Sequence, residues 1–148
     1  MDHKNFAGKL HRLTRMLTTL SEHRWSSDGY EDVKMGHLQA LIPMNDQDLT
    51  NNHLAIAAGM TKQSMNRLTS ELMIAGYILH SKKKSADGRE KLLTLSQKGK
   101  LFMNYLNTTR YDLENKLTEV LGVSKFLELN RTLESLLTFV ETRHKTLS

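Results

Sequence analysis

Cysteine is absent from the sequence, and this absence excludes several kinds of site. Without thiols the chain has no structural disulfide, no thiolate zinc site and no cysteine-based redox switch. Proline occurs only once and no low-complexity tract is present, so the 148 residues are typical of a globular chain of one-domain size. No run approaches the roughly 18 apolar residues of a membrane span, and the charged N-terminus lacks the apolar segment of a signal peptide. We therefore expect a soluble, cytoplasmic protein with no membrane partner.

Positive charge exceeds negative charge in this chain. Its 21 lysines and arginines outnumber its 16 aspartates and glutamates, which gives a formal net charge of +5 at pH 7. Such a balance favours an anionic partner, nucleic acid first, although basic domains without such a partner are also common. Whether the partner is nucleic acid therefore depends on how the charges are distributed along the chain.

Helical periodicity marks the N-terminal part of the chain. Apolar residues recur at alternating steps of four and three, which predicts a first helix from Lys4 to about Arg24. A stretch rich in Ser, Asp and Gly, from Trp25 to Tyr30, breaks the pattern. A shorter second helix follows and stops near Pro43.

The C-terminal third returns to long helices. After Ser96 the apolar residues recur with helical spacing, and Gly122 divides the pattern into two helices. The middle of the chain, roughly 45 residues long, is too small to cover the apolar stripes of the first and last helices. We therefore expect helices of two subunits to cover one another in a homodimer.

The segment that begins at Thr50 has the pattern of a helix-turn-helix. Thr50 or Asn51 can cap a first helix and Thr61 a second, because their side chains accept hydrogen bonds from free backbone amides. Between the helices Gly59 permits a tight turn, and Ala55 leaves room for a close crossing. The positions that such a motif buries are apolar here, namely Leu54, Ala58, Met60, Met65, Leu68 and Leu72.

The opposite face of the second helix carries polar side chains that suit DNA. Arginine can pair with guanine, and glutamine or asparagine with adenine, while the flanking polar residues can reach phosphates. The alternative is a merely solvated face, which the framework of Gly59 and Ala55 disfavours. At about 100° per residue, the candidate DNA contacts on this helix are Thr61, Lys62, Gln63, Ser64, Asn66, Arg67 and Ser70.

A basic hairpin is predicted after Gly76, which ends this helix. Tyr77 to Ser81 and Leu92 to Leu95 have the composition of strands, with Asp87 and Gly88 as an Asp-Gly turn. The connection between them holds five cationic side chains and two carboxylates, so the basic patch is local. A charged tip can be simply solvated, but beside a helix-turn-helix it can follow phosphates and place an arginine in the minor groove. The candidate contacts here are Lys82, Lys83, Lys84 and Arg89.

These residues resemble the MarR family of winged helix-turn-helix regulators over most of the chain. The segment LAIAAGMTKQSMNRLTSELMIAGYI is similar to the family's paired helices, and ADGREKLLTLSQKG to its wing and the next helix start. Asp87 and Arg89 match the Asp-x-Arg signature of the wing, and Ser96 stands where threonine is commoner. The resemblance implies a homodimer with a recognition helix in each major groove and a wing toward each minor groove. It also implies a ligand crevice between the dimerisation and DNA-binding regions.

The predicted architecture is a single, mainly α domain over residues 1–148 with a small β-hairpin. A winged helix-turn-helix core at about 33–95 is flanked by dimerisation helices at about 4–25 and 97–146. Trp25 faces either the implied crevice or the dimer contact. Because the family lines its crevice from the first, second and fifth helices, the candidate effector contacts are His11, Arg15, Met35, His37 and Tyr105.

Other chemistries find little support in the sequence. The seven histidines are scattered without an HxxxH pair, so we expect no metal site and no cofactor. Residues 97–121, where the family's zinc-sensing branch carries histidines, contain none. The sequence has no GxSxG motif, no Ser-x-x-Lys followed by the further motifs of a serine nucleophile, and no glycine-rich phosphate loop, which disfavours an enzyme. The eight methionines fall mostly at core spacing, with an adaptable pocket or oxidation sensing as the alternative.

We therefore expect a homodimeric transcription regulator that binds a pseudopalindromic operator in duplex DNA, with half-sites one helical turn apart. Repression is expected to end when a small ligand stabilises a dimer geometry that cannot bind. The alternative is a winged-helix protein-interaction module whose basic face meets an acidic protein.

Overall fold

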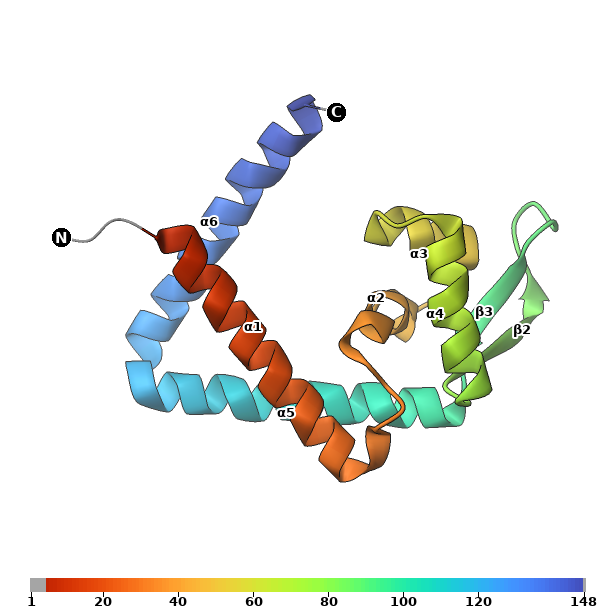
Figure 1. The fold of residues 1–148 in the computed structure, drawn as a ribbon. Helices are drawn as coiled ribbons and strands as arrows, with labels where there is room; N and C mark the ends of the chain where they lie inside the picture. The colour runs from red at the N-terminus through yellow and green to blue at the C-terminus, as the bar shows by residue number, and fades with distance from the viewer. Residues whose placement is uncertain (1–4, 148) are drawn as a thin grey trace. The chain divides into compact units, whose positions relative to one another are not determined.

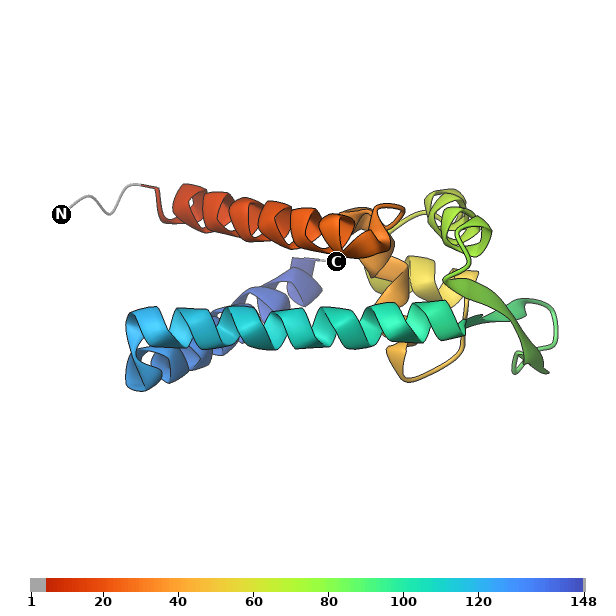
Figure 2. The same ribbon diagram turned by 90° about the horizontal axis from the view of Figure 1, so that it is seen from below.

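The computed structural model describes residues 5–147, which are helical apart from one small antiparallel sheet (Figures 1 and 2). The chain divides into two compact units, of which the first ends at Leu106 and the second begins at Asn107. Lys4, the predicted start of the first helix, lies outside the described residues. In chain order the elements are α1 (Phe6–Trp25), η1 (Ser26–Tyr30), η2 (Met35–His37), α2 (Leu38–Leu41), η3 (Pro43–Asn45), β1 (Leu49–Thr50), α3 (Asn51–Ala58), α4 (Lys62–Ile74), β2 (Ile78–Lys84), β3 (Lys91–Leu95), α5 (Gln97–Leu121) and α6 (Val123–Leu147).

The first unit opens with α1, whose predicted end near Arg24 is confirmed at Trp25. The chain then makes the π-helical turn η1 before an irregular stretch leads into η2, α2 and η3. Pro43 starts η3, because its fixed φ suits a first helical position although it cannot continue α2. The predicted second helix is therefore three short turns rather than one helix.

Helices α3 and α4 form the predicted helix-turn-helix. Thr50 Oγ1 accepts a hydrogen bond from the amide of His53 at 3.2 Å, and Thr61 Oγ1 accepts one from the amide of Ser64 at 3.1 Å. Gly59 connects the helices with φ 64° and ψ 31°, a left-handed conformation that costs little without a side chain. Both caps and the turn are thus where the residue types require them.

A hydrophobic core in the first unit holds the helix-turn-helix in place. Ala55 is buried, as expected for a close approach of α3 and α4. Of the other positions predicted to be apolar and buried, Leu54, Met65, Leu68 and Leu72 are buried, while Ala58 and Met60 are half-buried against the core.

Trp25 belongs to this core, so the prediction that it faces a crevice or a dimer contact was wrong. Its side chain is 1% exposed, and its ring packs edge to face on Phe102 with centroids 5.8 Å apart. The indole Nε1 donates a hydrogen bond to the carbonyl oxygen of Val33 at 2.8 Å. A buried indole needs such a partner for its N–H, and the chain supplies one internally.

The sheet has the order β1-β3-β2, and all its pairs are antiparallel. Strand β1 was not predicted, because two residues are too few to show an alternating pattern. Strand β2 extends to Lys84, so Lys82, Lys83 and Lys84 lie in a strand and not in the predicted loop. Pairing between Lys84 and Lys91, after a register shift, produces this extension. Asp87 and Gly88 do turn the chain, within a longer connection of residues 85–90.

The start of α5 is fixed to the sheet and to the end of α4. Ser96 Oγ caps α5 by accepting a hydrogen bond from the amide of Gly99 at 3.1 Å, and it donates one to the carbonyl of Gly76. A Cβ at Gly99 would collide with the backbone oxygen of Tyr77. Glycine is therefore required for this close approach.

The second unit contains the C-terminal half of α5 and the whole of α6, which Gly122 separates as predicted. Helix α6 is amphipathic, yet none of its residues is buried in the single chain. Its apolar side chains include Leu129, Phe139 and Val140, at 45%, 55% and 59% exposure. Within residues 5–147 no helix combines the length and the hydropathy that crossing a bilayer needs.

Candidate nucleic-acid interface

The outer face of α4 presents the polar side chains that the sequence predicts there. The same helix buries Met65, Leu68 and Leu72, so its two faces are clearly divided. Thr61 donates its hydroxyl hydrogen to Ser64 Oγ at 2.9 Å, which places both hydroxyls at the N-terminus of the helix. The predicted DNA contacts Thr61, Lys62, Gln63, Asn66, Arg67 and Ser70 are exposed, and Ser64 is half-buried.

An ion pair joins the first residue of α4 to the hairpin. Lys62 Nζ lies 2.9 Å from Glu90 Oε1, with side-chain exposures of 59% and 32%. The hydrogen bond from Lys62 is the main reason why the pKa of Glu90 is below its ordinary value. A hydrogen bond with Thr50 acts in the same direction. One carboxylate thus links the wing to the beginnings of both helices of the helix-turn-helix.

Helix α4 runs alongside the β2–β3 hairpin (Figure 1). A groove of about 410 Å³ between them is lined by Asn66 and Ser70 from α4, and by His80 and Lys91 from the hairpin. Directly paired residues of antiparallel strands share a face of the sheet. Since Lys84 pairs with Lys91, both lysines lie on the face toward α4.

The remaining basic side chains of the wing are exposed at other positions. Lys83 lines the opposite side of the sheet together with Asp48, and Lys82 is exposed on β2. At the tip, Asp87 Oδ1 accepts a hydrogen bond from the amide of Arg89 at 3.0 Å. This bond holds the turn and is the main cause of the lowered pKa of Asp87. The Arg89 side chain is exposed.

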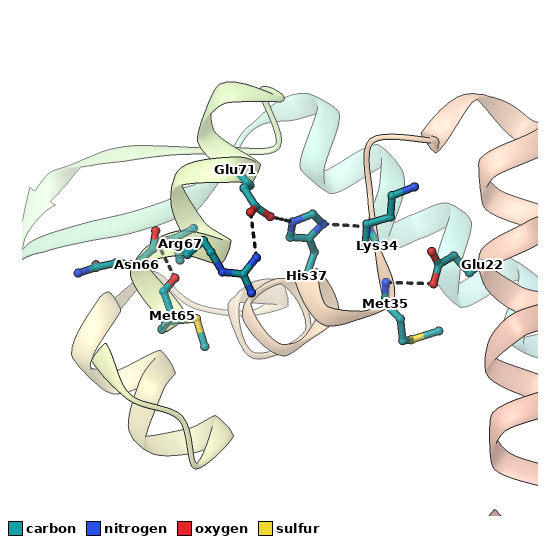
Figure 3. Close-up of polar contacts among 9 residues, drawn as sticks. Glu22, Lys34, Met35, His37, Met65, Asn66, Arg67 and Glu71 are labelled. Atoms are coloured by element: carbon teal, nitrogen blue, oxygen red, sulfur yellow. Dashed lines mark hydrogen bonds and ion pairs between the residues drawn. The ribbon is translucent and has the colours of Figure 1, made fainter. Parts of the chain in front are cut away.

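Arg67 contacts Glu71, and Glu71 contacts His37, although the sequence assigned neither Glu71 nor His37 to the DNA contacts (Figure 3). Arg67 Nη1 lies 3.1 Å from Glu71 Oε1, and Glu71 Oε2 lies 2.7 Å from Nε2 of the buried His37. The hydrogen bond from His37 is the main cause of the lowered pKa of Glu71, and the charge of Arg67 adds to it. The spacing of four between Arg67 and Glu71 predicts their contact on a helix, whereas no local pattern predicts that of His37.

The five candidate effector contacts are dispersed in the first unit. His11 and Arg15 are exposed on α1, and His37 is occupied by Glu71. Tyr105 donates a hydrogen bond to Asp28 at 2.6 Å, and burial together with this bond raises the pKa of Tyr105 to about 12.

Met35 alone of the five lines an apolar cavity of about 600 Å³ at α2 and α3. The other residues of its lining include Ile42, Pro43 and Ala57. Within residues 5–147, no three His, Asp or Glu side chains gather as a metal site would require.

By sequence, no protein-family model and no curated protein matches this chain. Many solved structures match its fold. FabT of Streptococcus pneumoniae, solved in complex with DNA, matches with a TM-score of 0.79 and 16% identity over 92% of this chain and 95% of FabT. MepR, a transcription regulator of the Staphylococcus aureus multidrug efflux pump MepA, matches with a TM-score of 0.72 and 14% identity over 93% of this chain and 99% of MepR. A MarR family protein of Mycobacterium tuberculosis, in complex with salicylic acid, matches with a TM-score of 0.65 and 21% identity over 91% of this chain and 98% of that protein.

Proposed function

Because the chain has the winged helix-turn-helix fold of MarR family transcription regulators, we propose that it is a sequence-specific regulator that binds duplex DNA. The observation that carries this proposal is the exposed polar face of α4 beside a basic hairpin. The FabT structure, which has the same fold and contains DNA, supports it.

In this proposal α4 enters the major groove. Arg67 pairs with guanine, while Gln63 and Asn66 pair with adenine, and each good pair contributes roughly 1 to 3 kcal/mol of discrimination. Phosphates are contacted by the lysines of α4 and β2, which position the helix without reading sequence. Arg89 at the tip of the wing enters the minor groove, where the negative potential attracts a guanidinium.

The regulator is proposed to act as a homodimer. The apolar stripe of α6 is exposed in the single chain, and so are Phe6, Leu13 and Leu20 of α1. Large exposed apolar surfaces of this kind mark interaction sites. A two-fold dimer presents its recognition helices about 34 Å apart, which requires a pseudopalindromic operator.

The same proposal includes a small-molecule effector and repression. The Mycobacterium tuberculosis relative binds salicylic acid, so the fold accommodates a small aromatic acid in that protein. An effector shifts operator affinity when it binds one dimer geometry better than the other. A repressor of this kind acts in the cytoplasm and has no catalytic role.

A protein-interaction module is the competing function, because the same basic face would suit an acidic protein. The two are separated by measuring affinity for random duplex DNA over a range of salt concentration. Several phosphate contacts give a log-log slope of about −0.9 for each contact. A weak, salt-independent response would favour the protein partner. Arg67→Ala then tests base reading, since it should reduce the preference for the operator over random DNA.

A further inference from the structure

Arg67 does not project freely from α4. Its side chain is 68% exposed, yet its Nη1 is 3.1 Å from Glu71 Oε1, one helical turn further along. A guanidinium has five N–H donors in a planar fork, and this contact uses one end of the fork. The other donors remain available for a base edge, so Glu71 restricts the direction of Arg67 without blocking it.

Glu71 is itself held by a residue from another element. Its second oxygen, Oε2, lies 2.7 Å from Nε2 of His37, whose side chain is only 5% exposed. An exposed pair at this spacing on a helix usually has a loose geometry and contributes little to stability. Here the carboxylate is fixed at both oxygens, and one of the two fixing groups belongs to the core.

The hydrogen bonds of His37 also determine which form of the imidazole is present. The amide of Lys34 donates to His37 Nδ1 at 2.9 Å, so Nδ1 is an acceptor. In a neutral imidazole the proton is then on Nε2, which donates to Glu71. In this tautomer the ring holds the carboxylate of Glu71 through its Nε2 hydrogen.

The segment that carries His37 is held in turn by α1. The amide of Met35 donates to Glu22 Oε2 at 3.3 Å, and Figure 3 shows these contacts as a series from α1 to Arg67. Each group in the series has a fixed partner. The position of the guanidinium thus depends on Glu71 and, through it, on His37 and Glu22 from other elements.

From this geometry we propose that Glu71 and His37 are positioning residues that set the base preference of Arg67. The inference rests on the proposed DNA-binding function and adds two specificity-determining residues to it. Glu71 acts directly on the guanidinium, and His37 acts through Glu71. Neither residue needs to touch DNA.

The test compares operator affinity with affinity for an operator in which the guanine read by Arg67 is replaced. We expect Glu71→Gln, which removes the charge but keeps the size, to reduce this preference about tenfold. His37→Leu should do the same, whereas His37→Gln, which keeps a donor, should retain most of the preference. His23→Gln, at an exposed histidine of α1, is the matched control. Thermal unfolding of each variant checks the fold, and Glu71→Gln alone decides if His37→Leu does not fold.

A double-mutant cycle separates positioning from a general structural role. In an Arg67→Ala background, Glu71→Gln should leave the base preference unchanged, because the residue on which it acts is missing. If Glu71→Gln lowers the base preference as much in the Arg67→Ala background as in the unaltered protein, Glu71 acts through the fold, and the inference is overturned. An unchanged preference in Glu71→Gln while DNA is still bound would also overturn it. Failure of the unaltered protein to bind DNA would instead overturn the proposed function, and this inference with it.

Discussion

Replacing Glu90 by glutamine should strengthen binding to duplex DNA of any sequence. In the free protein Glu90 Oε1 forms an ion pair with Lys62 Nζ at 2.9 Å. Lys62 is the first residue of α4, where a phosphate would also meet the free amides of the helix N-terminus. Removing the carboxylate releases one cation toward DNA and takes away one repelling charge.

The size of the effect follows from counterion release. One phosphate contact changes the log-log salt slope by about −0.9, which at 0.1 M salt corresponds to about eightfold in affinity relative to 1 M. The side chains are 59% and 32% exposed, and a solvent-screened pair of this kind contributes little to folding. Loss of the pair should therefore leave the fold intact.

Fluorescence anisotropy with a labelled random duplex, at about 50 to 200 mM salt, measures both affinity and slope. Glu31→Gln, at an exposed carboxylate in the turn after η1, changes the net charge equally and serves as the control. Glu90→Gln should give a steeper slope than this control by about 0.9. If the two variants have the same slope, Lys62 does not become a phosphate contact and the reasoning fails.

Three further predictions concern the wing, the core and acid stability. Lys84→Ala should weaken binding to all sequences alike, and more than Lys83→Ala, because Lys84 lies on the face toward α4; equal effects in a binding titration would refute the assigned faces. Phe102→Ala should lower the free energy of unfolding by about 3 to 5 kcal/mol in urea denaturation, since the ring is fully buried. Burial raises the pKa of Asp32, but hydrogen bonds from Tyr77 and Lys98 outweigh it, so the folded-state pKa is below its ordinary value. Its stabilisation is therefore present above about pH 4 and lost as pH falls through the lower folded value, and Asp32→Asn should flatten that fall in urea titrations.

Sequence patterns predicted the features that depend on neighbouring residues. The caps at Thr50 and Thr61, the turn at Gly59 and the polar face of α4 each follow from residue types a few positions apart. Strand β1 could not be predicted, because its two residues form a strand only through pairing with β3. The bond from His37 to Glu71 joins residues 34 positions apart, so only the folded chain brings them together.

In the proposed function, the exposed face of α4 reads base sequence while the basic hairpin follows the phosphate backbone. Selection of binding sites from a random duplex pool, with the unaltered protein and Arg67→Ala in parallel, measures this base reading. The selected sites should form a pseudopalindrome with half-sites about one helical turn apart. One guanine in each half-site should lose its enrichment in Arg67→Ala. Recovery of no motif, or of the same motif with both proteins, would show that Arg67 of α4 does not read base sequence.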